Sequence, residues 1–237
     1  MGRLLIAGIV ICFLTANVQA TVVLWEDWES GTDGWVDLSG TVVPTLSNEQ
    51  NTTPGGTYSL KVQGNTIGNS MNALDRNLDA ATAVNWYVEW SFFDTGATRE
   101  YLQIRSYSEG GSSGALQQWI SFGVYNAGVD LTVYNARVTN GGVGWTNTTI
   151  RRVPNVWHTM RVEQDEAGNL KFFIDGQLGL ETTTTSIYGI TSLRVGSALT
   201  NGGAAVYFDD IKVGIVPEPA TLALLLCGLP FLRRRSA

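Results

Sequence analysis

The stretch Trp86-Tyr87-Val88-Glu89-Trp90-Ser91-Phe92 carries a large apolar residue at every second position. Successive side chains of a β-strand point to opposite faces, whereas side chains on one face of a helix recur about every 3.6 residues. Trp86, Val88, Trp90 and Phe92 therefore share one face of a predicted strand. Four large apolar side chains on one face indicate a strand whose inner side packs into a substantial core.

Shorter stretches on both sides repeat this alternation, and residues 21–215 show no helical periodicity. Turn sequences such as Ala167-Gly168-Asn169 and Asp175-Gly176 separate them and supply the positive φ that tight hairpins need. Many short strands without an internal repeat predict one all-β domain, a two-sheet antiparallel jelly-roll sandwich. The further predicted strands are Tyr58–Gln63, Tyr101–Tyr107, Gln118–Tyr125, Asp130–Val138, Trp157–Gln164, Leu170–Asp175, Ser192–Gly196 and Ala205–Val213.

The N-terminal end differs from this β pattern. Residues 1–20 combine Arg3, an apolar stretch from Leu4 to Leu14 and the small-x-small sequence Val18-Gln19-Ala20. This order is typical of a secretory signal peptide, whose apolar part forms a helix and which is removed from the mature protein. The sequence therefore predicts an exported chain that begins near Thr21.

The C-terminal end has three parts in a fixed order: Pro217-Glu218-Pro219, an apolar run, and Arg233-Arg234-Arg235. The run Ala220–Leu232 has thirteen residues, whereas a membrane-spanning helix needs about 20. The three parts resemble the PEP-CTERM sorting signal, which in its family is read by a membrane protease-transpeptidase called exosortase. An unprocessed, weak membrane helix is the alternative interpretation of the same residues.

This resemblance divides the chain into residues 1–20 as signal peptide, 21–215 as the β-sandwich domain and 216–237 as the sorting signal. It implies exosortase as a processing partner and a transient association of the short C-terminal hydrophobic helix with the inner membrane. It also implies a final location in the cell envelope, on the outer surface or outside the cell. Cleavage and retention of the signal both stay open.

Removing the two ends changes the composition of the chain. Both cysteines, Cys12 and Cys227, lie in the ends, so residues 21–215 have neither a disulfide nor a thiol nucleophile. The full chain has 15 basic and 21 acidic residues, and residues 21–215 contain 11 of the basic and 20 of the acidic ones. The net charge therefore changes from −6 for the full chain to −9 for these residues. An acidic domain argues against nucleic acid or anionic lipid as its partner.

Two pairs of segments resemble known β-sandwich families. In Val156–Val162 the predicted strand opens with Trp157-His158, and the hairpin that follows ends in Ile-Asp-Gly at Gly176. Both features are similar to the concanavalin A-like lectin/glucanase superfamily, which includes laminin-G-like domains. The opening Leu24–Gly31, followed by Gly34-Trp35, and the closing Val206–Val213 resemble jelly-roll carbohydrate-binding modules. The residues do not separate these two families.

The sequence contains no recognisable catalytic group. Glycosidases use two carboxylates about 5–10 Å apart, and the hydrolytic members of the superfamily carry a Glu-x-Asp-x-x-Glu strand that is absent here. The acids Glu163, Asp165 and Glu166 lead into a turn and are interpreted as a solvated hairpin tip. The single histidine, His158, shares the parity of Met160 and is predicted to face the core, so no histidine metal cluster is expected.

The carbohydrate-binding modules that this chain resembles tie their first and last strands together with a structural Ca²⁺. That resemblance implies calcium ligands at Glu29 and at Asp209 or Asp210, because calcium prefers carboxylate and carbonyl oxygens. Under this hypothesis Ca²⁺ raises the melting temperature. The alternative is that these acids are surface charges that protect edge strands from pairing.

Aromatic side chains on the polar parity of three predicted strands indicate a sugar-binding face. They oppose apolar neighbours such as Leu102, Ile104, Ile120 and Phe122 along the chain. If the strands adjoin, flat rings that stack on sugar C–H faces would alternate with planar polar side chains that bind hydroxyls. Packing in the core is the alternative for each ring. The predicted sugar-binding residues are Tyr101, Gln103, Arg105, Tyr107, Trp119, Tyr125 and Tyr134.

Three functions agree with these features. The first is an exported, noncatalytic domain that binds polysaccharide or an exopolysaccharide matrix. The second is a polysaccharide hydrolase or lyase of the same superfamily, which turnover of a polysaccharide would reveal. The third is a structural or adhesive envelope protein, which self-association without glycan binding would reveal.

Overall fold

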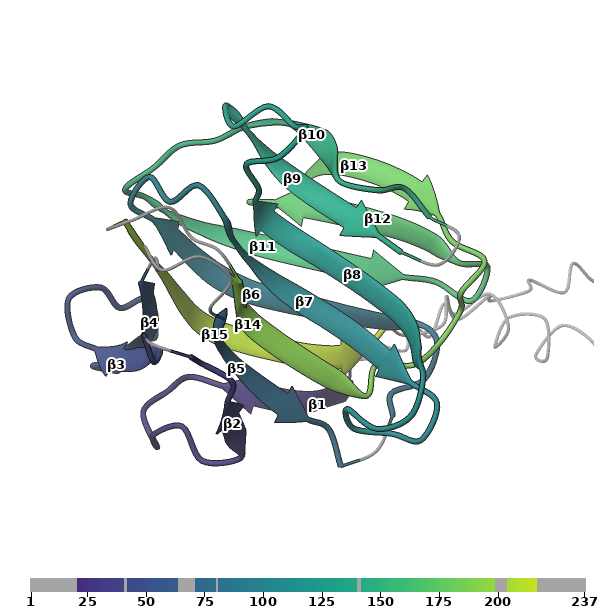
Figure 1. The fold of residues 1–237 in the computed structure, drawn as a ribbon, viewed down its shortest axis with the longest axis horizontal. Coiled ribbons are helices and arrows are strands. Elements are labelled where there is room, and N and C mark those ends of the chain that lie inside the picture. The colour runs from purple at the N-terminus through teal and green to yellow at the C-terminus, as the bar shows by residue number, and fades with distance from the viewer. Residues whose placement is uncertain are drawn as a thin grey trace, which may run out of the picture. The chain divides into compact units, whose positions relative to one another are not determined.

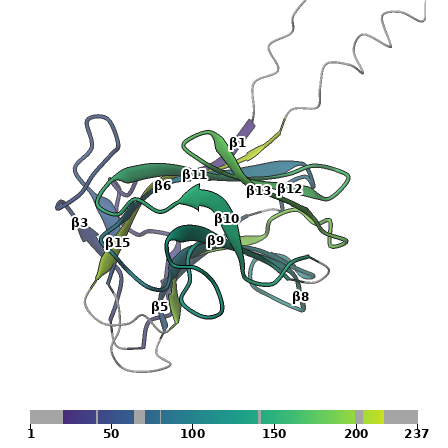
Figure 2. The same ribbon diagram turned by 90° about the horizontal axis from the view of Figure 1, so that it is seen from above.

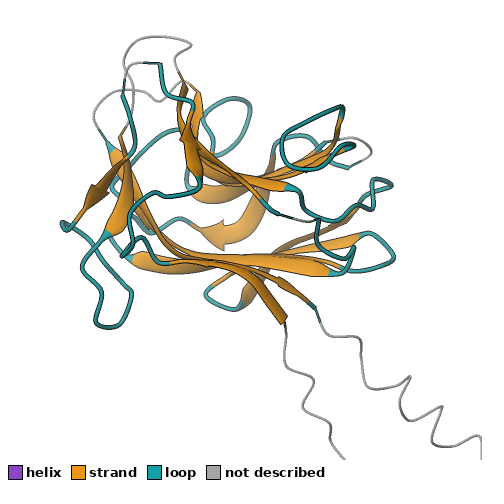
Figure 3. Ribbon diagram, turned by 90° about the horizontal axis from the view of Figure 1, so that it is seen from below, coloured by secondary structure: helices purple, strands orange, loops and turns teal. Residues whose placement is uncertain are grey.

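A computed structural model describes residues 21–40, 42–63, 71–79, 81–139, 142–198 and 204–216. These residues form strands joined by turns and loops, without a helix among them (Figure 3). Residues Thr21–Val216 make one compact unit that contains both sheets and the core. No described residue belongs to a helix long and apolar enough to cross a membrane. The two predicted terminal helices and the sorting residues Pro217, Glu218, Pro219 and Arg233–Arg235 lie outside the described residues.

One layer of the molecule is an eight-stranded sheet (Figure 2). Seven of its strands follow one path, and the eighth, β1 (Thr21–Glu26), pairs with the C-terminal half of β15. The first and last strands are thus neighbours. The path is β13 (Gln177–Thr183), β12 (Asn169–Ile174), β11 (Trp157–Gln164), β6 (Trp86–Asp94), β15 (Ala205–Ile215), β4 (Ser59–Gln63) and β3 (Thr45–Ser47).

The other layer is a seven-stranded sheet, whose central strands lie in front in Figure 1. Every strand pair in both sheets is antiparallel. The predicted all-β, two-sheet antiparallel sandwich is therefore confirmed. The order is β10 (Thr146–Arg151), β9 (Val133–Val138), β8 (Leu116–Val124), β7 (Glu100–Tyr107), β14 (Ser192–Ala198), β5 (Met71–Asn77) and β2 (Trp35–Asp37).

The core lies between the sheets and is built from the inward side chains of both. Trp86, Val88, Trp90 and Phe92 are all fully buried, as their alternation predicts. Trp90 makes an edge contact with Phe122 of the other sheet at 5.8 Å between ring centroids. Burying a side chain of this size contributes roughly 1.5–3 kcal/mol, so this single strand anchors much of the sandwich.

The predicted turn at Asp175-Gly176 joins β12 to β13. Asp175 has φ 51° and Gly176 has φ 76°, the pair of positive angles that a two-residue type I′ hairpin requires. The strands β2, β3, β5, β10 and β13 were not predicted as such. They are short, polar or at sheet edges, where alternation is weak.

Candidate functional site

A row of polar residues crosses the seven-stranded sheet. Asp75, Arg194, Gln103, Ser121 and Arg137 come from five neighbouring strands, and each lies directly opposite the next. Directly opposed residues share one face of a sheet. The chain neighbours of these residues, including the buried Leu74, Val195 and Leu102, point into the core. The row therefore lies on the side of the sheet away from the core, hereafter the outer face.

A second row runs beside the first, with Ser192, Arg105 and Trp119 opposite one another. On β7, Tyr101 and Tyr107 also share this side with Arg105, because they are separated from it by even numbers of residues. The outer face thus combines tyrosine and tryptophan rings with arginine, glutamine and serine side chains.

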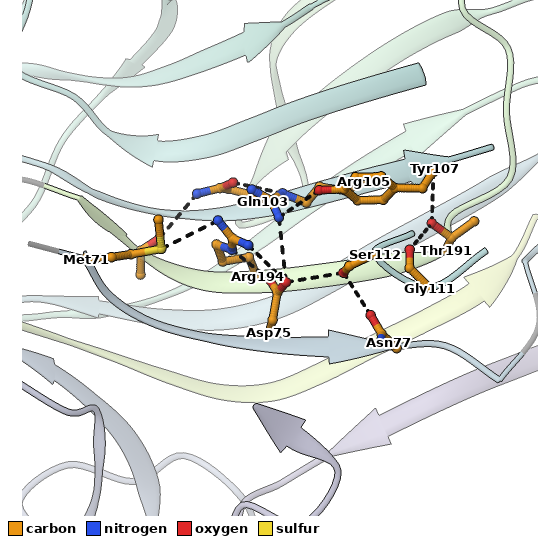
Figure 4. A network of polar contacts seen from close by, with 11 residues as sticks. Met71, Asp75, Asn77, Gln103, Arg105, Tyr107, Gly111, Ser112, Thr191 and Arg194 are labelled. Carbon is orange, nitrogen blue, oxygen red and sulfur yellow. Dashed lines mark hydrogen bonds and ion pairs between the residues drawn. The ribbon is translucent and has the colours of Figure 1, made fainter. Parts of the chain in front are cut away.

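Asp75 is the centre of a buried polar network on this face (Figure 4). Its carboxylate accepts two hydrogen bonds from Arg194, from Nε at 2.7 Å and Nη2 at 2.9 Å, and Arg105 Nη1 lies 3.7 Å away. Arg105 also donates to Gln103 Oε1 at 3.1 Å and to the Tyr107 hydroxyl at 3.2 Å. Such charge-assisted pairs fix the direction of each side chain. Burial and the nearby Arg194 lower the pKa of Arg105.

The loop between β7 and β8 explains why these outward side chains are buried. Ser112 of this loop donates to Asp75 Oδ2 at 3.2 Å and to Asn77 Oδ1 at 2.8 Å, two strands away from β7 (Figure 4). Thr191 holds the same loop by donating to the Gly111 carbonyl at 2.6 Å. The loop therefore covers the Asp75 end of the network and shields it from water.

Trp119 forms the first accessible aromatic position of the outer face. Its ring is half-buried, and the Arg137 guanidinium lies 4.3 Å from the ring centroid. Its indole Nε1 donates to Ser121 Oγ at 2.7 Å. A cation–π contact and a hydrogen bond hold this ring in place, so a ligand would meet a preorganised surface.

A second aromatic group lies just beyond the end of β8. Tyr125 and Trp145 stack in parallel, 3.9 Å apart with an interplanar angle of 6°, and the Arg99 guanidinium lies 4.5 Å from the Tyr125 ring centroid. Tyr101 packs beside Trp145 at 5.0 Å and is only 7% exposed. Burial raises the pKa of Tyr101 to about 12.

Small residues separate the two aromatic groups. Trp119 and Tyr125 are six residues apart, which corresponds to about 20 Å along a strand, with Ser121 and Gly123 between them on the same side. A Cβ atom at Gly123 would lie 2.4 Å from the Glu100 carbonyl oxygen, so only glycine fits there. The outer face thus presents two ring positions along one strand with little side-chain bulk between them.

Six of the seven predicted sugar-binding residues lie on this face. Tyr107, Trp119 and Tyr125 are half-buried and accessible, whereas Tyr101, Gln103 and Arg105 are buried beneath or beside them. Five further residues of the same face were not predicted from the sequence. They are Asp75, Arg99, Arg137, Trp145 and Arg194.

The prediction for Tyr134 is wrong, because this ring is fully buried in the core against Phe92 and His158. Strand β9 begins at Val133, and its alternation places Val133, Asn135 and Arg137 on the outer side. Tyr134 shares its side with buried Ala136 instead. The same alternation places Arg137 on the outer face and could have identified it.

The predicted calcium ligands contact a different loop. Asp209 is fully buried, and its oxygens accept hydrogen bonds from the amides of Thr52, Thr53 and Asp210 and from the Thr53 hydroxyl, at 2.9–3.2 Å. Burial raises the pKa of Asp209, and these hydrogen bonds act in the opposite direction. N–H and O–H donors surround the carboxylate where a calcium site needs oxygens.

Glu29 Oε1 likewise accepts from the amides of Thr57 and Tyr58, at 2.7 and 2.8 Å. Asp210 accepts from the exposed Trp25 indole at 3.2 Å. Within the described residues, no group of three or more His, Cys, Asp or Glu side chains is placed to share a metal ion. In this arrangement the three acids do not fit a calcium ion, and they hold the β3–β4 loop and β1 against β15.

No protein-family model and no curated protein matches the chain. Solved structures do match it. The cellulose-induced protein Cip1 superimposes with a TM-score of 0.58 at 15% identity, covering 80% of this chain and 96% of that one. The globular domain of T. cruzi calreticulin gives 0.56 at 11% identity, with 88% and 92% covered. A Bacillus subtilis protein of unknown function with a galectin-like fold gives 0.54 at 12% identity, with 83% and 98% covered. At these identities the likeness shows the β-sandwich fold.

Proposed function

We propose that residues 21–216 form a carbohydrate-binding domain without catalytic activity, carried by an exported protein of the cell surface or extracellular matrix. The observation that carries this proposal is the outer face of the seven-stranded sheet. There, half-buried rings at Tyr107, Trp119, Tyr125 and Trp145 lie among guanidinium and amide groups.

The chemistry of this face suits a sugar chain. A pyranose ring has apolar C–H faces that stack on Tyr and Trp rings, and a rim of hydroxyls that need directed hydrogen bonds. The buried Asp75–Arg194–Arg105–Gln103 network fixes polar groups beside the rings before any ligand binds. Preorganisation of this kind lowers the entropy cost of binding.

A polysaccharide panel tests this proposal with the processed chain, residues 21–216. We expect saturable binding to at least one polysaccharide without product release. Trp119→Ala should weaken binding about tenfold or more, because truncating an aromatic anchor residue of a binding surface costs about 2 kcal/mol or more. The matched control is Trp157→Ala, which removes a half-buried tryptophan from the opposite side of the sandwich, where it packs on Phe93 at 5.4 Å.

The two variants separate the possible results. Loss of binding in Trp157→Ala but not in Trp119→Ala would place the site on the eight-stranded sheet and contradict the proposal. Release of shortened sugar products would favour a hydrolase or lyase. Absence of binding together with self-association would favour a structural or adhesive envelope protein.

The proposal includes processing by exosortase after export. It is supported by the signal-peptide pattern of residues 1–20 and by the Pro-Glu-Pro, apolar and arginine segments of residues 217–235. In a host that carries exosortase, the intact mass of the protein should correspond to loss of the C-terminal segment. Replacing Pro217, Glu218 and Pro219 together by alanine should leave that segment attached, and a full-length wild-type chain would contradict this step.

A further inference from the structure

The charge of the outer face is opposite in sign to that of the domain. Residues 21–215 contain 11 basic and 20 acidic residues, a net charge of −9. On the described parts of β5, β7, β8, β9 and β14, however, the only acids are Asp75 and Glu100. Glu100 lies opposite Val124 of the core, which leaves Asp75 as the single carboxylate of these strands that shares the outer side.

Four arginines share the face with that carboxylate. Arg194 forms the two-point pair with Asp75, and Arg105 lies farther from the same carboxylate at 3.7 Å. Arg137 and Arg99 lie over aromatic rings, one at each of the two aromatic positions. On these strands one acid faces three guanidinium groups on the outer side, which gives the face a net positive charge within a strongly acidic domain.

Arginine over an aromatic ring is arranged for recognition of an anion. The ring contacts the flat side of the guanidinium, while the N–H groups of its edge can still form two parallel hydrogen bonds with a carboxylate or sulfate. Trp119 and Arg137 together would therefore contact both the apolar face of a sugar and an acidic substituent on it. Both side chains are half-buried, which holds them in place and keeps them reachable.

We propose that the ligand of this face is an acidic glycan, one that carries carboxylate or sulfate groups. This inference rests on the proposed function and adds its substrate class. An acidic sugar residue binds at Trp119 and Arg137, and the chain follows β8 over Ser121 and Gly123 toward Tyr125. Arg105 contributes positive potential beneath the chain rather than a direct contact, because it is only 7% exposed.

The overall charge of the domain selects against other polyanions. A net charge of −9 repels nucleic acid, anionic membranes and densely charged polysaccharides alike at long range, where many anionic groups act together. A glycan that carries a localised acidic group beside an apolar sugar face can match one arginine–tryptophan pair. The combination of a positive face and a negative surround therefore favours a glycan over a nucleic acid.

The test compares charged and neutral polymers built on the same sugar backbone, using residues 21–216. Polygalacturonate is paired with its methyl ester, and dextran sulfate with dextran. We expect binding to at least one acidic polymer to exceed binding to its neutral partner by about tenfold or more, since hydrogen bonds to charged groups have this strength. Raising the ionic strength from about 0.01 M to about 1 M, which shortens the Debye length from about 30 Å to about 3 Å, should weaken that binding.

Two variants with the same change in net charge locate the interaction. Arg137→Gln should reduce binding of the acidic polymer about tenfold and leave binding of the neutral partner unchanged. Arg161→Gln, on the outer side of the eight-stranded sheet, should change neither. Arg137→Lys keeps the charge but lacks the planar guanidinium group. Its affinity for the acidic polymer should lie between those of the wild type and Arg137→Gln. Thermal melting of each variant confirms that it is folded.

Each outcome decides between the inference and the proposed function. Preference for either acidic polymer with loss in Arg137→Gln supports the inference, and the pair that shows it identifies carboxylate or sulfate as the group bound. Equal binding of charged and neutral polymers overturns the inference but retains carbohydrate binding. Binding to none of the polymers counts against both. Equally tight binding of single-stranded DNA would overturn the inference by showing a general polyanion surface.

Discussion

The outer sides of the two sheets carry the same types of residue and use them differently. On the eight-stranded sheet, Arg161 covers the Tyr87 ring at 3.9 Å, much as Arg137 covers Trp119 on the other sheet. Arg161 is also paired with two carboxylates, Glu89 at 3.1 Å and Glu163 at 2.7 Å. Its charge is therefore neutralised within the protein.

Three aromatic residues on the outer side of the eight-stranded sheet are likewise occupied within the protein. Phe93 packs against Trp157 and Tyr207, at 5.4 and 5.9 Å between centroids, so these rings mainly cover one another. Lys61, which lies 5.7 Å from the Tyr207 ring centroid, is paired with Glu49 at 2.7 Å. On the seven-stranded sheet, Arg105 and Arg194 share one aspartate, Asp75. Arg137 and Arg99 lie over rings that remain accessible. Rings and arginines therefore do not distinguish the two faces by themselves, and the proposed binding face is the one on which guanidinium groups outnumber carboxylates.

The largest expected effect comes from removing the one carboxylate of the positive face. Asp75→Ala leaves Arg105 and Arg194 buried without a counter-charge and should lower the free energy of unfolding by about 3–5 kcal/mol. Urea denaturation measures this loss. The matched change on the other sheet, Glu163→Ala, should cost about 0–1 kcal/mol, because Arg161 keeps Glu89 and the pair is partly exposed. Equal losses in both variants would show that the two faces do not differ as described.

The buried tyrosine of the positive face gives the next effect, which depends on pH. The pKa of Tyr101 is raised from 10.0 to about 12 by burial, so folding favours the neutral phenol. The contribution of this phenol to the free energy of unfolding is fully present below pH 10 and is lost as the pH rises through about 12. A shift of this size corresponds to about 2–3 kcal/mol. Tyr101→Phe should remove that part of the alkaline loss in urea denaturation at successive pH values, and an unchanged pH profile would show that the phenol is solvated.

The outer side of the eight-stranded sheet has its own buried aspartate, and its replacement should cost less than that of Asp75. Asp209→Ala leaves the amides of Thr52, Thr53 and Asp210 without their acceptor and should destabilise the protein by about 1–3 kcal/mol. No arginine is left unpaired by this change. Proteolysis should cut the β3–β4 loop of the variant faster than that of the wild type, and equal cleavage would contradict a role in holding the loop.

The sequence predicted the fold well where one side of a strand is apolar and the other is not. The bounds of β11 were predicted to the residue, and the inner side of β6 was predicted correctly because four large residues alternate without interruption. Polar strands gave weaker signals: β5 carries Asp75 and Arg76 beside Leu74 and was not predicted at all. Alternation is visible only when burial differs between the two sides.

The candidate site could be predicted in part, because its rings lie on strands whose alternation is clear. Its charge balance could not, since Arg194 and Asp75 meet Arg105 only through the order β7–β14–β5. That order joins residues about 90 and 30 positions from Arg105 along the chain, and no local pattern reports such pairing. The sequence therefore located aromatic residues of the outer face. It did not locate Arg194 and Asp75, which help to distinguish this face from the outer side of the eight-stranded sheet.

The smallest expected effect concerns the calcium ion that the resemblance to carbohydrate-binding modules implies. Adding Ca²⁺ or EDTA should leave the melting temperature unchanged, because amide and hydroxyl donors already occupy the oxygens of Asp209, and amides occupy Oε1 of Glu29. A bound cation would repel those donors and would require the β3–β4 loop to turn its carbonyl oxygens toward the carboxylates instead. A rise in melting temperature with Ca²⁺ that disappears in Asp209→Ala would show that the loop makes this change. The eight-stranded sheet would then hold a cation through its carboxylates, while the seven-stranded sheet carries the arginines that are proposed to bind an anion.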